Sequence, residues 1–345
     1  MSATHPAGPI VSIVTPAFNA EHFIAHTIES VLRQTFTDFE LLVIDDGSDD
    51  GTSGIAERYA KRDSRIHLSR QTNRGIAAAR NSGIKQARGR LIALLDSDDL
   101  WLPTFLCEQL AILEEHPEIA ILSANALNFG GPFDGEPLLP VAGDAPIYPV
   151  PLLTLIQQED SLSIFAVFRR ELFDAVGTFD ETLHRSEDYD LWLRAASAGL
   201  LIAVNPRPLG LYRRRADSLS ADEALMLDAM KQPLAKVQQA FADRPDIRTA
   251  IDAKLVALAE RRLVAKARTA LVEGDMAALP SRFAALADAT GSARYRFASW
   301  LSGKAPATIR WAYRCKRTLG QLSPGRRSGR RPPRALHSRT RRADY

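Results

Sequence analysis

The chain has 345 residues, of which 46% are hydrophobic and 25% charged, proportions typical of a soluble globular protein with one large domain or two ordinary ones. Its net charge of +3 conceals an uneven distribution, because residues 314–345 hold eleven Lys or Arg and one acid, which leaves −7 on the rest. With only two cysteines, the chain cannot form a disulfide framework. No apolar run approaches the roughly 20 residues of a membrane helix, so we expect no membrane-spanning segment.

The first 130 residues alternate between two hydrophobic patterns. Continuous apolar runs predict buried strands at 10–18, 39–48, 65–70, 90–96 and 119–127. Apolar residues at helical spacing predict helices at 20–35, 51–62, 75–87 and 103–116. This alternation requires crossover connections, so we expect an α/β fold with a mostly parallel sheet and helices on both faces.

The remainder of the chain changes character several times. Residues 130–151 are rich in Gly and Pro and predict an irregular connection, and residues 200–215 predict strand-like segments broken by prolines. A strand and a short helix are expected within 163–181, and a helix at 186–199. A mainly helical, Ala/Leu-rich region follows and then a basic, polar end that favours disorder. We therefore expect three segments: 1–220, 221–320 and 321–345.

Polar side chains follow three of the predicted strands. Asn19 comes after the strand at 10–18, Asp45 and Asp46 lie at the end of the strand at 39–48, and Asp96 and Asp98 lie at the end of the strand at 90–96. Ligands of open parallel sheets bind beyond the carboxyl ends of the strands. If these strands are adjacent and parallel, the three motifs converge on one crevice.

Asp96 and Asp98 carry the densest negative charge of the sequence. Two residues apart on extended chain, their carboxylates point to the same side and repel each other unless a cation joins them. Mg²⁺ and Mn²⁺ take such carboxylates together with phosphate oxygens of a substrate. The alternative is an ordinary turn or helix N-terminus, where acids are also favoured.

Two further acidic pairs have two interpretations each. Asp45 and Asp46 either accept hydrogen bonds from a base or ribose or form an Asx-turn before Gly47. Glu187 and Asp188 open a predicted helix, where acids suit the helix dipole. On a rigid element facing a crevice, one of them would instead serve as a general base.

Arginines supply the opposite charge. Arg213, within the stretch Tyr212–Arg215, either places a cation on a leaving diphosphate or belongs to an ordinary basic loop. The same two interpretations apply to Arg74 and Arg80.

Over roughly residues 9–220, the sequence resembles the inverting family 2 glycosyltransferases, which have the GT-A fold. The resemblance rests on four blocks in this order: VSIVTPAFNAEHFIAHTIESVLRQTFTDFELLVIDDGSDDGT, NRGIAAARNSGIKQARGRLIALLDSDDLWLP, VGTFDETLHRSEDYDLWLRAASAG and LYRRR. It implies transfer of a sugar, with inversion, from a nucleotide-diphosphate sugar to an acceptor hydroxyl. A glycan or lipid-linked acceptor, in the synthesis of a cell-surface polysaccharide or glycolipid, is what the family favours.

The resemblance also assigns roles to positions of this chain. Pro16, Phe18 and Asp45 match contacts with the base and ribose, although Phe18 stands where many relatives carry Tyr. Asp96 and Asp98 match the signature that binds a divalent cation, Mg²⁺ or Mn²⁺, with Asp98 as the direct ligand. Asp188 matches the catalytic base, and Glu187 is the next candidate.

Rival functions make different predictions. A sugar-phosphate nucleotidyltransferase would release pyrophosphate, but the sequence lacks a Gly-rich Arg/Lys loop near its N-terminus. A nucleic-acid-binding protein is suggested by the basic end alone, and the acidic body opposes it, so we expect no nucleic-acid partner. A catalytically inactive binder of nucleotide-sugars would not need the full set of acids.

The segment 300–345 combines aromatic residues with Lys and Arg, among them Trp300 and Trp311. This mixture suits a segment that lies on an anionic membrane surface. The alternative is a solvated tail that aids solubility. With the reduced thiols expected of its two cysteines, we expect a cytoplasmic enzyme, peripheral on the inner face of the membrane.

Overall fold

The structure is a computed structural model that describes residues 8–131, 133–215, 218 and 221–321. It divides into two compact units, the first ending at Arg215 and the second beginning at Ala216. The predicted disordered segment 321–345 lies outside the described residues, apart from Gln321, the last residue of a helix.

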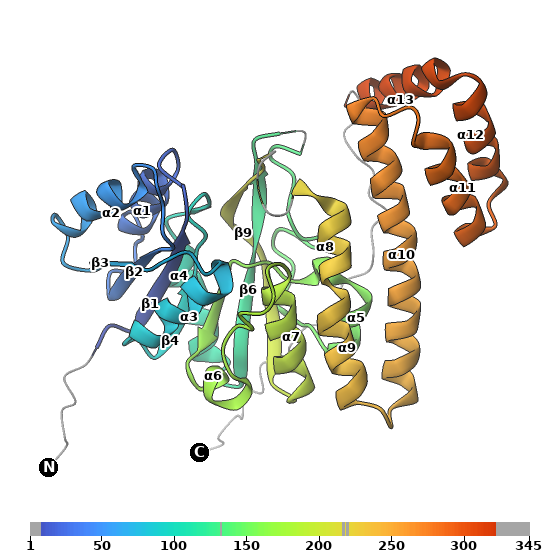
Figure 1. Cartoon of the computed structure of the whole chain (residues 1–345). Helices are drawn as coiled ribbons and strands as arrows, with labels where there is room; N and C mark the ends of the chain where they lie inside the picture. Colours follow the sequence, from blue (N-terminus) through green and yellow to red (C-terminus); the bar gives the residue numbers. More distant parts are fainter. Residues whose placement is uncertain (1–7, 132, 216–217, 219–220, 322–345) are drawn as a thin grey trace, which may run out of the picture. The chain divides into compact units, whose positions relative to one another are not determined.

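A nine-stranded sheet forms the centre of the first unit (Figure 1), in the order β3-β2-β1-β4-β8-β6-β9-β5, with β7 paired to β9. Strands β3, β2, β1 and β4 are parallel, β6 and β9 are parallel, and β8 joins the two groups through antiparallel ladders. The strands are β1 Val11–Ala17, β2 Phe39–Asp45, β3 Ile66–Arg70, β4 Leu91–Leu94, β5 Leu100–Trp101, β6 Ile119–Phe129, β7 Tyr148–Pro149, β8 Ala166–Arg169 and β9 Leu201–Arg213.

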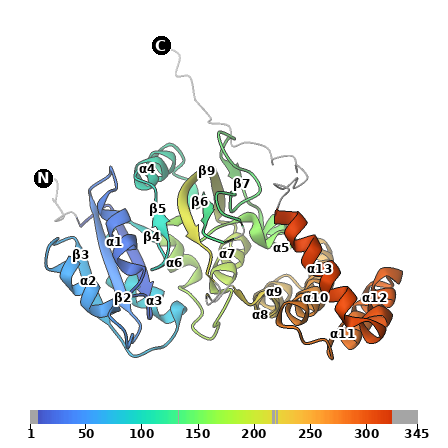
Figure 2. The same ribbon diagram turned by 90° about the horizontal axis from the view of Figure 1, so that it is seen from above.

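Helices cover both faces of this sheet, as the alternation predicts. Figure 2 shows α4 on one side of β6 and β9 and α7 on the other. Every residue of β1 and β2 is buried, which explains why these strands are continuous apolar runs. The helices are α1 Ile24–Leu32, α2 Thr52–Ala60, α3 Ile76–Gln86, α4 Phe105–Glu115, α5 Leu152–Gln157, α6 Glu171–Val176 and α7 Glu187–Ser197, with a 3₁₀ turn at Glu159–Ser161.

The predicted α/β architecture is therefore confirmed, but one local prediction is wrong and another is incomplete. Residues 201–213 form one strand rather than segments broken by prolines, because the ladder between β6 and β9 shifts register around Asn125 and so accommodates Pro206 and Pro208. The connection 130–151 is irregular as expected, yet it contributes the two-residue strand β7.

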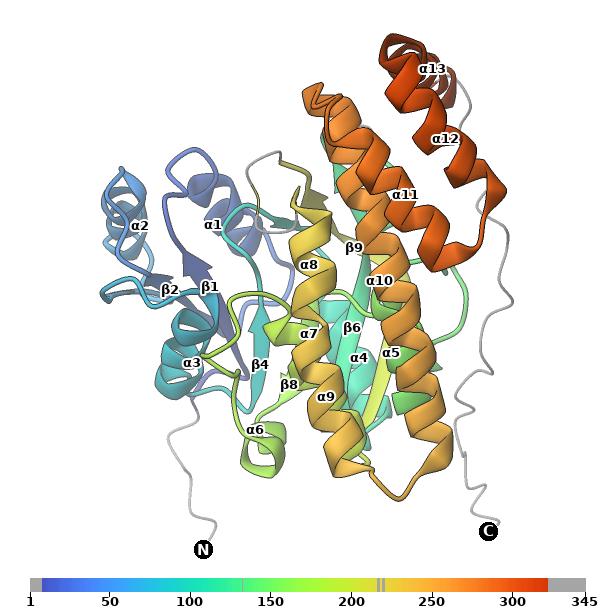
Figure 3. The same ribbon diagram turned by 45° about the vertical axis from the view of Figure 1, so that its right-hand side comes forward.

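The second unit is helical (Figure 3). Its longest helix, α10, starts with Pro245, whose fixed φ suits a first turn, and stops before Gly274, which has a φ of 85°. Its core is a cluster of Ala267, Ala270, Leu271, Leu279, Phe283 and Leu286. The helices are α8 Glu223–Ala229, α9 Lys231–Ala240, α10 Pro245–Glu273, α11 Leu279–Thr290, α12 Ala293–Lys304 and α13 Pro306–Gln321. Among the helices of the described residues, none is both long and apolar enough to cross a bilayer.

Candidate active site

The strand ladders bring three of the predicted motifs to one edge of the sheet. Ala17 of β1 pairs with Asp45 of β2, and Val14 of β1 pairs with Leu94 of β4. The carboxyl ends of these three parallel strands are therefore neighbours, as the convergence hypothesis requires. The residues that follow them form the floor of the candidate site.

Asp45 ends β2 with no exposed surface. Its Oδ1 accepts a hydrogen bond from the Ser48 amide at 2.9 Å, which closes a turn around Gly47 that is one residue longer than the expected Asx-turn. Its Oδ2 has no hydrogen-bond partner and lies 3.5 Å from Nε of Arg70. The turn thus occupies one carboxylate oxygen of Asp45, and the other lies buried beside Arg70.

Asn19 and Asp46 organise the loops around this position. Asn19, with a φ of 48°, accepts a hydrogen bond from the Asp49 amide, and its own amide donates to Oγ of Ser48. Asp46 accepts hydrogen bonds from the amides of Arg74 and Gly75 and from the side chain of Gln71. Both side chains are therefore committed to holding loops within the described structure.

Pro16 and Phe18 flank the end of β1. Pro16 is buried within the strand, whereas 50% of the Phe18 side chain is exposed. An exposed ring beside a buried carboxylate is a suitable platform for a nucleobase, which has an apolar face and polar edges.

Three carboxylates crowd the turn between β4 and β5. The Asp99 amide donates to the Asp96 carbonyl at 3.1 Å, so the acids lie on a turn and not on the extended chain predicted from their spacing. Burial and the neighbouring charge of Asp96 raise the pKa of Asp98. Burial, with the charges of Asp98 and Asp96, raises the pKa of Asp99 well above its usual range. Oδ2 of the buried Asp99 has no hydrogen-bond partner.

Two arginines at the end of β9 face this turn. The Arg213 amide donates to Oδ1 of Asp99 at 2.8 Å, and its Nε donates to the Asp98 carbonyl at 2.7 Å. Arg215 pairs with Oδ2 of Asp98 at 3.1 Å. Both guanidinium groups lie over the ring of Phe23, at 5.1 and 4.4 Å from its centroid. This aromatic contact fixes two cations beside the acidic turn.

Arg80 joins the two halves of the site. It projects from α3, is 2% exposed, and donates to Oδ1 of Asp96 at 2.7 Å and to Oε1 of Glu187 at 2.5 Å. Burial alone would lower its pKa, but the charges of Asp96 and Glu187 raise it above the ordinary value. A buried guanidinium held by two carboxylates fixes the position of both.

Glu187 and Asp188 begin α7, directly after Ser186. Ser186 is buried with a left-handed φ of 59°, a strained conformation of the kind that gathers at functional sites. Burial raises the pKa of Glu187 and of Asp188, and the charge of Arg80 opposes the rise in both. Glu187 is 6% exposed and tied to Arg80, whereas Asp188 is half-buried and accepts from the Tyr189 amide at 2.7 Å.

The acidic turn fits a divalent cation on chemical grounds. It offers hard carboxylate oxygens, their mutual repulsion raises pKa values, and a buried oxygen of Asp99 lacks a partner. Among the described residues, no three His, Cys, Asp or Glu side chains are grouped as a complete ligand set. Sites that use one or two protein carboxylates are completed by phosphate oxygens of the substrate.

Hydrogen bonds, adjacent strands or adjacent positions in the chain thus connect seven of the predicted site residues: Asp45, Asp96, Asp98, Glu187, Asp188, Arg80 and Arg213. The sequence pattern assigned no role to Phe23, because it is a single aromatic residue with no motif around it. It also passed over Thr27, whose hydroxyl lies 2.9 Å from the carbonyls of Ser97 and of Asp99 and so holds the acidic turn. Helical spacing places Thr27 on the same face as Ile24 and Ile28. A polar residue on this apolar face could have indicated that its hydroxyl makes a buried hydrogen bond.

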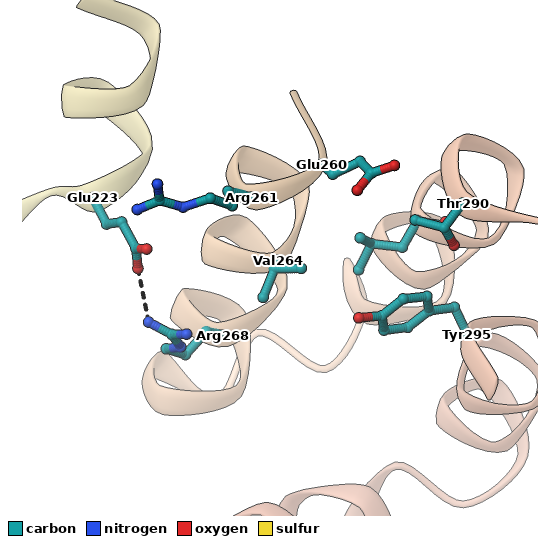
Figure 4. Close-up of a pocket in the computed structure, with 8 residues that line it drawn as sticks. Glu223, Glu260, Arg261, Val264, Arg268, Thr290 and Tyr295 are labelled. Atoms are coloured by element: carbon teal, nitrogen blue, oxygen red, sulfur yellow. Dashed lines mark hydrogen bonds and ion pairs between the residues drawn. The ribbon is translucent and has the colours of Figure 1, made fainter. Parts of the chain in front are cut away.

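The second unit contains a pocket of its own (Figure 4), with a volume of about 240 Å³. Arg268 pairs with Glu223 at 2.7 Å on one side of it, and Tyr295 and Thr290 lie on the other. None of the predicted site residues lines this pocket. Its lining consists of Glu223, Glu260, Arg261, Val264, Arg268, Leu286, Thr290 and Tyr295.

Residues 12–177 match the family model described as Glycosyl transferase family 2. The glycosyltransferase EpsJ of Bacillus subtilis is 34% identical over 240 residues, which cover 67% of this chain and 68% of that protein. The Escherichia coli protein WfgD, named UDP-Glc:alpha-D-GlcNAc-diphosphoundecaprenol beta-1,3-glucosyltransferase, is 46% identical over 105 residues, 30% of this chain and 41% of its own.

Among solved structures, residues 1–349 of TarS from S. aureus, in complex with UDP-GlcNAc, have a similar fold. The TM-score is 0.60 at 23% sequence identity, and the match covers 90% of this chain and 92% of that one. Glu187 and Asp188 lie beyond the range of the family model, so their position is known from the fold and not from that match.

Proposed function

The chain belongs to glycosyltransferase family 2, and from this premise we propose that it transfers a sugar from a nucleotide-diphosphate sugar to an acceptor hydroxyl, with inversion and with a divalent cation, in the synthesis of a cell-surface glycan. One observation carries the proposal. Arg80 holds Asp96 on the donor side of the site and Glu187, next to the proposed base, through two hydrogen bonds.

The donor would occupy the edge formed by β1, β2 and β4. Phe18 offers an exposed ring for stacking on a base, and Oδ2 of Asp45, buried beside Arg70 in this structure, would accept from a base N–H or a ribose hydroxyl in place of Arg70. Arg213 and Arg215 place positive charge beside the acidic turn, where the diphosphate would lie. A low-dielectric site that already holds such charges stabilises a leaving diphosphate without reorganisation.

Asp98 and Asp96 would hold Mg²⁺ or Mn²⁺. The cation, when bound, would screen the charge of the diphosphate and help to orient it. The cation would also stabilise the ionised forms of these acids, since it would offset the repulsion that raises the pKa of Asp98 and Asp99.

Asp188 is better suited than Glu187 to act as the base. Arg80 occupies Oε1 of Glu187, and burial leaves that carboxylate little access to an acceptor. Asp188 is more exposed, and its raised pKa makes it a stronger proton acceptor than an ordinary Asp. Glu187 is then a positioning residue that links the base to Arg80.

The reaction is one displacement at the anomeric carbon. The acceptor oxygen forms a bond to this carbon while the bond to the phosphate oxygen breaks, and that electron pair leaves with the nucleoside diphosphate. Asp188 takes the proton of the acceptor hydroxyl. Attack from the face opposite the leaving group inverts the anomeric configuration, and the transition state has oxocarbenium character.

A donor screen tests this function without knowledge of the acceptor. Uridine, thymidine and guanosine diphosphate sugars are compared by thermal shift with and without Mn²⁺, because a ligand at 100 times its Kd adds about 2.7 kcal/mol of stability. The stabilising donor is then incubated with enzyme and the products are separated. Nucleoside diphosphate supports the proposal, whereas pyrophosphate from a sugar phosphate and a nucleoside triphosphate would establish the nucleotidyltransferase alternative.

A further inference from the structure

Helix α12 presents aromatic rings on the side opposite its buried face. Tyr295 and Ala298 pack against the core of the second unit. Phe297 follows Tyr295 by two residues, about 200° around the helix, and Trp300 lies one turn further along the same stripe. These two rings are 60% and 59% exposed and stack on each other with centroids 5.8 Å apart.

Helix α13 repeats this arrangement. Ile309 and Tyr313 pack against the same core, and Trp311 lies midway between them in sequence, again about 200° away. Trp311 is 67% exposed, the largest exposed fraction among the exposed large hydrophobic residues of the described chain. Soluble proteins rarely leave several large apolar side chains exposed together, and where they do, the surface usually binds a partner. Three exposed rings on two successive helices therefore indicate an interaction site.

The same part of the chain is free of negative charge. Between Asp288 and Asp344 the sequence has no Asp or Glu and fifteen Lys or Arg. Four of these, Arg294, Arg296, Lys304 and Arg310, lie on the parts of α12 and α13 whose side chains are described. Lys304 follows Trp300 by four residues and so shares the stripe of Phe297 and Trp300.

We propose that the outer side of α12 and α13 binds an anionic lipid bilayer, with Phe297, Trp300 and Trp311 in the interface and the basic side chains against lipid headgroups. Aromatic rings favour the interfacial region, where their apolar faces leave water near the headgroups. Cations near such a surface add attraction that salt screens. This inference is independent of the proposed function, because binding requires neither donor nor acceptor.

Charge complementarity selects this partner over another protein. A protein partner would need acidic residues to pair with a stretch of this length, whereas an anionic bilayer meets every cation with the same chemistry. A nucleic-acid duplex would also attract the cations, but its bases are already stacked and would leave the three exposed rings without a partner.

Sedimentation of the full chain with vesicles tests the proposal. One set of vesicles contains phosphatidylglycerol, and the other is phosphatidylcholine alone. The wild-type chain should pellet with the anionic vesicles at low salt and be released at high salt. The triple variant Phe297→Ser, Trp300→Ser and Trp311→Ser should bind the anionic vesicles at least about tenfold more weakly than wild type. The double variant Arg294→Gln with Lys304→Gln should lose a comparable factor in affinity.

Matched variants in the first unit control for altered composition. Phe133→Ser removes another exposed ring, 45% exposed, and Lys85→Gln with Arg90→Gln removes two exposed cations. These variants should pellet like wild type. Circular dichroism melts, expected to be unchanged for exposed substitutions, show that each variant is folded.

Three results would overturn the proposal. The wild-type chain could fail to distinguish anionic from neutral vesicles. The aromatic variant could bind as well as wild type, which would reduce the interaction to charge alone. A DNA duplex could shift the chain at salt concentrations where vesicles do not bind it, which would identify the surface as a nucleic-acid site.

Discussion

The two units of this protein differ in how far their charged side chains are exposed to solvent. In the first unit, Asp45, Asp99, Glu187 and Arg80 are at most 6% exposed, and they gather at one edge of the sheet. In the second unit, the ion pair of Arg268 with Glu223 has side chains that are 53% and 40% exposed. Buried charge is costly, so four such side chains at one end of the sheet point to a reaction centre, whereas Lys254 is the one buried charged side chain among the described residues of the second unit.

Replacing the proposed base should give the largest effect. Asp188→Asn keeps the contact with the Tyr189 amide but cannot accept a proton, so the rate of sugar transfer should fall about 10²- to 10⁴-fold while donor affinity barely changes. Steady-state kinetics and donor titration measure the two quantities. The isosteric Glu187→Gln is the comparison, and near-normal transfer by Asp188→Asn would place the base elsewhere.

The same substitution has a pH signature. Because the pKa of Asp188 is raised in the folded state, ionised Asp188 costs stability, and this cost appears as pH rises from about 4 through the raised pKa. Asp188→Asn should therefore melt at a higher temperature than wild type at pH 7 and show no gain below pH 4. In the wild type, activity should fall as pH drops through the same raised pKa, since protonated Asp188 is no base.

Matched arginine substitutions compare the two units directly. Arg80→Gln leaves Asp96 and Glu187 without their buried cation and should cost about 3–5 kcal/mol in free energy of unfolding. Arg268→Gln breaks an exposed pair and should cost less than about 1 kcal/mol. Urea denaturation measures both, and similar costs would contradict the contrast between the units.

The metal assignment predicts a change in binding with little change in folding. Asp98→Ala should abolish the gain in donor affinity that Mn²⁺ gives the wild type, a factor of about 10–100 or more. Stability should hold or rise, because the substitution removes a charge that repels Asp96 and Asp99. Calorimetric titration of donor with and without Mn²⁺ decides the matter, with Asp246→Ala on the exposed surface of α10 as control.

Thr27→Val should give the smallest effect. The hydroxyl that it removes is within hydrogen-bond distance of the carbonyls of Ser97 and Asp99, so the acidic turn would lose about 1 kcal/mol of support. Donor affinity should fall a few-fold, and the rate with saturating donor should stay near normal. An unchanged affinity would mean that the turn is held by its other contacts.

Much of the fold was predictable because buried parallel strands leave a direct pattern in the sequence. The runs that became β1, β2 and β4 predicted both the sheet and the meeting of their polar ends. Two-residue strands such as β5 leave no pattern, since Leu100 and Trp101 become a strand through pairing with β9. The continuity of β9 also depends on its long ladder with β6, which overrides its prolines.

The candidate site was predicted less completely than the fold. Acids after strands are visible in the sequence, whereas the contact between Arg80 and Glu187 joins positions 107 residues apart and depends on how α3 and α7 meet. The arrangement of Phe23 with Arg213 and Arg215 has the same origin. Tertiary packing decides which charges meet, and composition or spacing carries no record of it.

The most direct test of the account is the configuration of the sugar that leaves the donor. With water as acceptor, hydrolysis of an α-linked nucleotide-sugar is run at an enzyme concentration high enough to outpace mutarotation, and proton NMR records the anomer of the released sugar. Direct displacement predicts the β-anomer and nucleoside diphosphate in equal amounts, with both slowed about 10²-fold or more by Asp188→Asn. Initial release of the α-anomer would contradict inversion, and equal rates for the wild type and the variant would contradict the role of Asp188.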